Sequence, residues 1–159
     1  MQAHDHDTAS VPDQDGHTQA GRAQEGRAAC FDIAAIAASL PETARTLLVD
    51  HRMTDREAAS ARVFRVYAAT PPHYHAGCDE YLYVISGRGS FWMEDPARLA
   101  EFRPGQLLFF ERRVVHAMPA LFEGPVVFLA IDTPRRDPKD IIFVDPEAGT
   151  PEGFIAAHG

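Results

Sequence analysis

Two histidines and a glutamate lie close together near the middle of the chain. His73 and His75 are separated by one residue, and Glu80 follows after four more. Side chains alternate between the two faces of an extended segment, so both imidazoles point to the same side. Two imidazoles and a carboxylate that meet in a buried site are destabilising unless a cation compensates them. The spacing therefore indicates a site for a divalent transition metal such as Fe, Mn, Zn, Ni or Cu. The alternative is three polar side chains that meet by chance on a wet edge.

Glu80 begins the stretch EYLYVIS, which alternates in the manner of a strand. If its carboxylate points inward, Leu82 and Val84 share its face, and Tyr81 and Tyr83 point outward.

The segments around these residues are short and rich in β-branched or aromatic residues. We expect strands within residues 45–53, 61–68, 80–86, 90–94, 98–102, 106–111, 114–118 and 126–132, and one more within 140–144. We expect turns to separate them at Thr70–Pro72, Gly87–Gly89, Asp95–Pro96, Pro104–Gly105 and Gly124–Pro125. Many short strands with no helix between them predict an antiparallel sandwich or barrel.

Three regions are predicted along the chain. Residues 1–28 are polar and without period, so we expect a disordered tail. Residues 29–133 are expected to form a single β-barrel domain that includes a short N-terminal helix, which has Asp32 as its N-cap and ends before Pro41. Residues 134–159 form an extension that packs on the outside of the barrel.

Composition excludes several classes of protein. The 159 residues carry a formal net charge of -8, which disfavours non-specific binding to nucleic acid. Two cysteines, Cys30 and Cys78, are too few for a disulfide scaffold and are expected to be free thiols. No apolar run reaches the roughly 20 residues of a membrane span, and the first residues do not resemble a signal peptide. The expectation is a soluble, cytoplasmic protein.

The sequence around the metal-binding candidates resembles the cupin superfamily. The first cupin motif is Gly-x5-His-x-His, three or four residues, Glu, six residues, Gly. His73, His75, Glu80 and Gly87 match it at every spacing, whereas Tyr67 replaces the leading glycine. The resemblance extends over roughly residues 62–132, and it implies a small single-domain cupin.

The second cupin motif, Gly-x5-Pro-x-Gly-x2-His-x3-Asn, is matched in part. Gly105 and His116 have the correct separation, but Glu111, Arg113 and Ala120 replace the proline, the second glycine and the asparagine. The resemblance implies His116 as the fourth metal ligand, after His73, His75 and Glu80. It also implies an all-β jelly-roll barrel (a double-stranded β-helix) that holds one divalent metal per chain with an open coordination position.

Three further residues are candidates for contact with a substrate. Cys78 lies between the ligands and could be a redox-sensitive thiol or only a small residue on a tight connection. Arg112 and Arg113 stand just before His116, where one guanidinium could bind a substrate carboxylate. The alternative is that Arg112 and Arg113 belong to a turn that is exposed to solvent and contacts no substrate.

Two functions follow from this interpretation. The first is a metal-dependent enzyme that acts on a small oxygen-bearing or carboxylate metabolite, with an Fe(II) dioxygenase favoured over an isomerase by analogy with the family. The second is a non-catalytic binding or sensing protein, in which the metal fixes a small-molecule ligand. Apolar residues on the outer face of the barrel favour a homodimer, which is common among small cupins.

Overall fold

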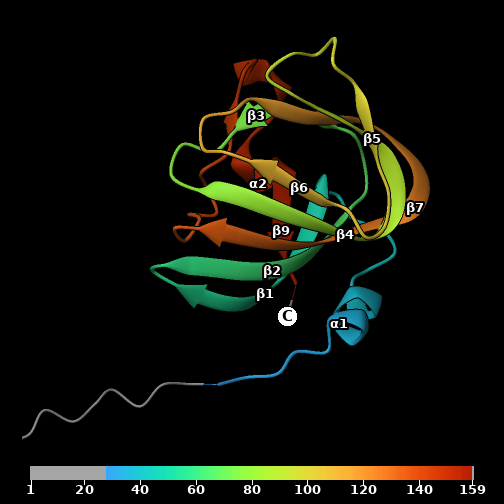
Figure 1. The fold of residues 1–159 in the computed structure, drawn as a ribbon, viewed down its shortest axis with the longest axis vertical. Coiled ribbons are helices and arrows are strands. Elements are labelled where there is room, and N and C mark those ends of the chain that lie inside the picture. The colour runs from blue at the N-terminus through green and yellow to red at the C-terminus, as the bar shows by residue number, and fades with distance from the viewer. Residues whose placement is uncertain (1–27, 159) are drawn as a thin grey trace, which may run out of the picture. The chain divides into compact units, whose positions relative to one another are not determined.

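The computed structural model describes residues 28–158, and residues from Phe31 onward form one compact unit. Figure 1 shows the strands wrapped into a barrel. The strands are β1 (Leu48–Arg56), β2 (Ala59–Val66), β3 (Thr70–Tyr74), β4 (Asp79–Met93), β5 (Ala100–Phe102), β6 (Leu107–Phe110), β7 (His116–Thr133), β8 (Ile142–Phe143) and β9 (Ile155–Ala157). The helices are α1 (Ile33–Ser39), the 3-10 helix η1 (Pro146–Ala148) and α2 (Pro151–Phe154).

The strands form one sheet in the order β5-β4-β7-β2-β1-β9, with β6 paired to β4 and β3 paired to both β7 and β8. All of these pairs are antiparallel except the pair of β1 with β9. This is the all-β jelly roll that was predicted. No helix among residues 28–158 has the length and apolar content needed to cross a bilayer.

Three of the predicted turns are wrong. Thr70–Pro72 belongs to β3, Gly87–Gly89 lies within β4, and Gly124–Pro125 lies within β7. The two long strands continue through these positions because β-bulges shift their register several times, which lets a strand bend around the barrel. Gly89 is required at such a bend, since a Cβ there would lie 2.5 Å from the carbonyl oxygen of Ala120. Turns do occur at Asp95–Pro96 and Pro104–Gly105.

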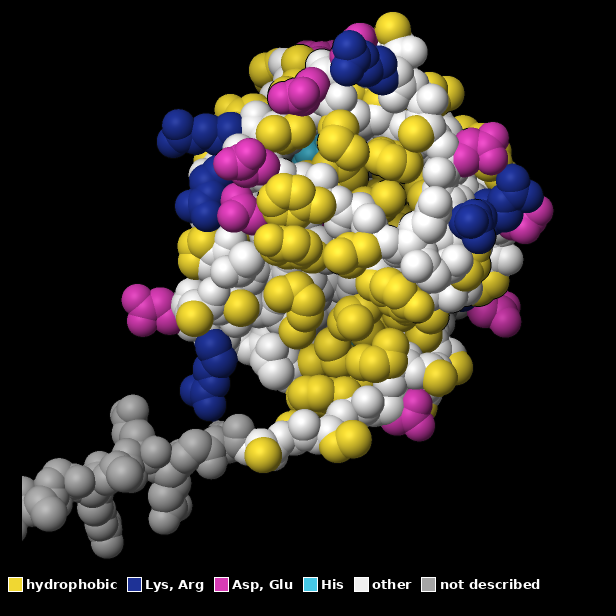
Figure 2. Space-filling model, viewed as in Figure 1, with side chains coloured by type: hydrophobic (Ala, Val, Ile, Leu, Met, Phe, Trp, Pro, Cys, Tyr) yellow, Lys and Arg dark blue, Asp and Glu magenta, His cyan; other side chains and the backbone are white. Residues whose placement is uncertain are grey.

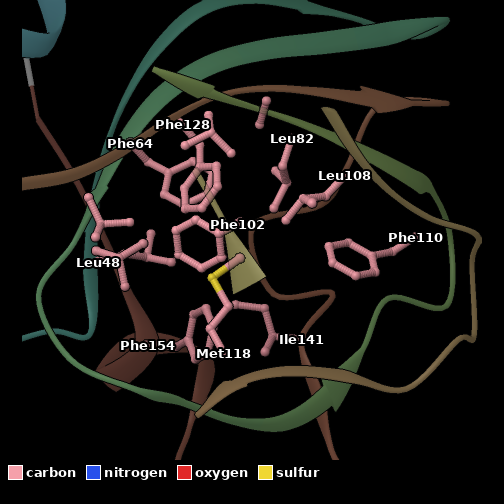
Figure 3. Close-up of a cluster of buried hydrophobic side chains, with 14 residues drawn as sticks. Leu48, Phe64, Leu82, Phe102, Leu108, Phe110, Met118, Phe128, Ile141 and Phe154 are labelled. Atoms are coloured by element: carbon pink, nitrogen blue, oxygen red, sulfur yellow. The ribbon is translucent and has the colours of Figure 1, made fainter. Parts of the chain in front are cut away.

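The barrel interior holds the main apolar core. Phe64, Phe102 and Phe128 lie together, with Met118 and Phe154 across from them (Figure 3). Strand alternation on β4 follows the prediction, because Leu82 and Val84 are buried in this core whereas Tyr83 is 43% exposed. The register of β4 therefore directs Glu80 into the barrel, on the same face as Leu82 and Val84.

Helix α1 packs on the outer face of the sheet. Its N-cap is Asp32, as predicted, and the carboxylate accepts a hydrogen bond of 2.9 Å from the amide of Ala35. Ile36 and Leu40 pack with Val63 and neighbouring apolar residues in a second, smaller core. Of the predicted tail, only Ala28 lies within the described residues.

The segment after β7 returns to the barrel. Strand β8 pairs with β3, and β9 runs parallel to β1. Phe154, between β8 and β9, and Ile141, directly before β8, are each 3% exposed. Part of this segment therefore lies inside the barrel core. The sequence had suggested only that residues 134–159 pack on the outside of the barrel.

Candidate metal centre

The histidines are brought together by the pairing of two strands. His73 on β3 is the cross-strand partner of His116 on β7, and their ring centroids are 4.5 Å apart. His75 follows directly after β3 and points to the same side as His73, as the alternation predicted. All three side chains are buried, with 3–4% exposure.

A backbone carbonyl fixes the orientation of each imidazole ring. A carbonyl oxygen can only accept a hydrogen bond, so each Nδ1 must carry the proton. In a neutral ring Nε2 then keeps its lone pair, which is the arrangement of histidine ligands that bind metals in proteins. The acceptors are the carbonyl oxygens of Pro71 for His73 (2.7 Å), of Asp140 for His75 (2.5 Å) and of Val114 for His116 (3.0 Å).

Burial keeps two of these rings neutral. It lowers the pKa of His116 to about 4. Burial, together with the neighbouring imidazoles of His116 and His75, also holds the pKa of His73 well below its ordinary value. The three histidines each offer a ligand atom within 4.8 Å of the other two. This group could hold a metal ion.

The carboxylate of Glu80 faces the same point. Its Oε2 lies 3.6 Å from Nε2 of His75 and 3.7 Å from Nε2 of His116. A tetrahedral ion about 2.1 Å from each ligand holds ligand atoms roughly 3.4 Å apart. Glu80 therefore places an anionic oxygen beside two members of the three-histidine group, and imidazole and carboxylate ligands of this kind suit a divalent cation.

The other oxygen of Glu80 is bound by arginine. Oε1 accepts hydrogen bonds from Nη2 of Arg62 at 2.8 Å and from Nη1 of Arg136 at 3.4 Å. Burial acts to raise the pKa of Glu80, but His75, Arg62 and Arg136 outweigh it and hold the pKa well below its usual range. The glutamate is therefore ionised and is oriented by its partners.

The site borders a small cavity inside the barrel. About 20 Å³ is open, which is room for about one or two water molecules. The polar part of its lining includes the three histidines, Glu80, Arg62 and Arg136. The apolar part includes Phe64, Leu82, Met118 and Phe154.

Comparison with known families identifies the fold of this region. Residues 63–132 match the model of the cupin domain. The chain contains a cupin domain. This match spans β2 to β7 and therefore includes all three histidines and Glu80.

Solved structures with the same fold are distant in sequence. An uncharacterized conserved protein with a double-stranded β-helix domain from Klebsiella pneumoniae has a TM-score of 0.55 and 14% identity, covering 69% of this chain and 93% of that one. The TT1209 protein of Thermus thermophilus has a TM-score of 0.55 and 19% identity, covering 67% of this chain and 98% of that one. No curated protein matches the sequence. These similarities show the cupin fold and do not indicate which activity this chain has.

The cupin barrel does not bring the predicted substrate contacts into its cavity. The Arg112 guanidinium instead binds the carboxylate of Asp79 through Nε and Nη2, at 2.8 and 3.0 Å, and is 46% exposed. Arg113 is exposed, and its φ of 68° belongs to the turn before His116, where its amide donates to the carbonyl of His75. These positions favour the solvated-turn interpretation of both arginines.

Cys78 is buried beside the site rather than exposed to the cavity. It is 1% exposed, and burial raises the pKa of its thiol to about 12. A protonated thiol is a poor metal ligand and a poor nucleophile. This position favours the interpretation of Cys78 as a small residue on a tight connection over that of a redox-sensitive thiol.

Two arginines inside the cupin barrel were missed. Arg62 is 1% exposed and also donates through Nε to Asp132 at 3.1 Å. It shares a strand face with Phe64 and Val66, so the alternation of ARVFRV could have placed it inward. Arg136 lies in the loop after β7, where no period in the sequence indicates which way a side chain points.

Proposed function

We propose that this cupin binds one divalent transition metal per chain through His73, His75, Glu80 and His116. The cluster of three histidine ligand atoms within 4.8 Å of one another, with Oε2 of Glu80 beside two of them, carries this proposal. Arg62 contributes by holding the glutamate through its other oxygen. The apolar lining of the cavity limits water around the site.

The proposed activity is that of a metal-dependent enzyme on a small oxygen-bearing or carboxylate metabolite. An Fe(II) dioxygenase is favoured, because four protein ligands leave room for further coordination, and an isomerase is the second candidate. A bound ion would supply Lewis-acid or redox chemistry at that open position. The protein's own groups would bind and orient the metabolite in a site of low polarity.

A non-catalytic binding or sensing function is the alternative. The small size of the cavity favours it, since about 20 Å³ leaves little room for a substrate together with a second reactant. In that function the metal fixes a small ligand and undergoes no turnover.

Metal analysis tests the site first. Protein purified without an affinity tag should contain about one divalent transition metal per chain. His75→Ala should lose most of it and melt at a lower temperature, because a bound ion stabilises the native state. His51→Ala is the control, since His51 contacts the carbonyl of His158 and lies outside the centre. Equal metal content in His75→Ala and the parent would refute the site.

Oxygen uptake then separates the two functions. The iron-loaded protein is screened with carboxylic acids, phenols and thiols, and His116→Ala serves as the inactive control. Uptake that depends on His116 supports the oxygenase. A protein that holds metal and binds such a compound without turnover supports the sensing function.

We also propose that the cupin forms a homodimer through an apolar patch on the outer face of β4, β6 and β7. The patch consists of Tyr83, Leu107, Phe109 and Ile131, whose exposed fractions range from 37% to 61%. Strand pairing makes it continuous, because Tyr83 is paired with Leu107, and Tyr81 is paired with both Phe109 and Ile131. Figure 2 shows hydrophobic side chains gathered on the face turned to the viewer. In a twofold dimer the same patch of each copy meets in the interface, so an exposed apolar patch suits this arrangement.

A further inference from the structure

Arg136 has donors in the barrel that the proposed metal site does not use. Its side chain is 2% exposed and lines the cavity. Nη1 lies 3.2 Å from Nε2 of His75 and 3.4 Å from Oε1 of Glu80. Nε and Nη2 are equally buried, and neither has a hydrogen-bond partner among residues 28–158.

Such donors indicate a missing acceptor. A buried N–H without a partner is destabilising, and more so when it belongs to a charged group. Nε and the adjacent Nη2 form the edge of a guanidinium that matches the two oxygens of a carboxylate. Arg112 binds Asp79 through this edge, and Arg135 binds Asp55 in the same way. The same edge of Arg136 is buried without such a partner among the described residues, in a side chain that lines the cavity.

The charge of the buried groups favours an anion as well. The barrel encloses two guanidinium groups, Arg62 and Arg136, and three carboxylates, Asp50, Glu80 and Asp132. Their sum is a charge of about -1, which a divalent cation would change to about +1. A ligand with one negative charge would bring this sum to zero.

We propose that Arg136 is the binding residue for the carboxylate group of a small monoanionic ligand, which it holds beside the metal through Nε and Nη2. The proposal rests on the proposed metal site, because the ligand contacts both. It identifies the carboxylates as the ligand class among the metabolites considered above. It also makes Arg136 the residue that distinguishes an anionic ligand from a neutral one, a role that the sequence suggested for Arg112 or Arg113.

Formate is the probe, because it is a bare carboxylate and suits a cavity of this size. The protein is loaded with Co(II), and formate is titrated while the visible absorption of the cobalt is recorded. Arg136→Gln should raise the dissociation constant for formate by about 10- to 100-fold, the usual effect of losing hydrogen bonds to a charged group. Arg135→Gln is the matched control and should change it by less than about 2-fold, because Arg135 is exposed and binds Asp55.

The outcomes separate this proposal from the metal site. A parent protein that binds no cobalt would overturn both. Cobalt binding with the same formate affinity in Arg136→Gln and in the parent would overturn only the role of Arg136.

Arg136→Lys covers the case in which the glutamine variant does not fold. It keeps the positive charge but loses the paired donors, so formate affinity should still fall by about 10-fold. If neither variant folds, Arg136 serves the structural ion pair with Glu80, and the proposal is wrong.

Discussion

Each histidine of the centre is held at two points. The strand directs the side chain into the barrel, and a carbonyl at Nδ1 fixes the ring so that Nε2 faces the barrel interior, where Nη1 of Arg136 lies 3.2 Å from Nε2 of His75. Glu80 is held in a comparable way, because Arg62 binds one of its oxygens and leaves the other facing the histidines. The donor atoms are therefore oriented before any ion arrives, which reduces the entropy lost on binding.

Arg62 should be important for stability. Replacement by leucine would remove the Arg62 guanidinium from the buried carboxylates of Glu80 and Asp132 and leave only Arg136 beside Glu80, so we expect a loss of about 3–5 kcal/mol in the free energy of unfolding. Arg88→Leu is the control, since Arg88 pairs with exposed glutamates on the surface and should change stability little. Urea unfolding of both variants measures the difference. Similar curves for the two would show that the buried pair contributes no more than the surface one.

The two thiols should differ in reactivity. Burial raises the pKa of Cys78 to about 12, so at pH 8 it is protonated as well as inaccessible, whereas Cys30 is exposed. We expect Ellman's reagent to modify one thiol per native chain quickly and the second only after unfolding. In Cys30→Ser the fast reaction should disappear. A fast reaction of Cys78 in the native protein would show that it is open to solvent.

The elements that build the centre come from distant parts of the chain. Strands β3, β4 and β7 supply the candidate ligands, and the segment after β7 supplies Arg136, Phe154 and the carbonyl of Asp140 that binds His75. Helix α2 ends at Phe154, whose ring centroid lies 4.8 Å from that of His73. This C-terminal segment is therefore part of the wall of the site.

Phe154→Ala should destabilise the barrel and enlarge its cavity. Loss of a buried aromatic side chain typically costs about 3–5 kcal/mol. Phe122→Ala is the control, because Phe122 is 50% exposed and its removal should change stability by no more than about 0.5 kcal/mol. Urea unfolding of metal-free protein measures both. A parent-like curve for Phe154→Ala would mean that the segment is docked only weakly in solution.

At the scale of the whole molecule, the two faces of the sheet have different partners. The inner face encloses the core and the candidate metal centre. Helix α1 packs against part of the outer face, around Val49, Val63 and Val127. The rest includes the apolar patch on β4, β6 and β7, where a second copy is proposed to bind.

Phe109→Glu should convert the proposed dimer into a monomer. A charge placed in the centre of an apolar interface is buried without a partner, which strongly opposes association. Leu99→Glu is the control, because Leu99 is 58% exposed and lies outside the patch. Size-exclusion chromatography with light scattering gives the mass of each. A monomeric parent would exclude the dimer at the concentration measured.

Local properties of the sequence determined much of this result. Alternation along strands correctly placed His73 and His75 on one side and Leu82 and Val84 inside, because the direction of a side chain depends on the local backbone. The Asp32 cap was predictable for the same reason. The resemblance of His73, His75, Glu80 and Gly87 to the first cupin motif also indicated the fold, and residues 63–132 match the cupin domain model. Turn residues were less informative, because Gly87 and Gly89 serve bulges as readily as turns.

Only the tertiary structure decided which groups surround the candidate ligands. Arg136 meets His75 across 61 positions of sequence, and the carbonyl of Asp140 meets the same histidine across 65. Such contacts depend on how the chain closes on itself, and no local period records them. Arg112 and Arg113 stand next to a candidate ligand in sequence yet lie on the surface, whereas Arg136 comes from a loop and is buried at the cavity. The physical reason is that burial is a property of the assembled barrel, to which distant segments contribute as much as neighbouring residues.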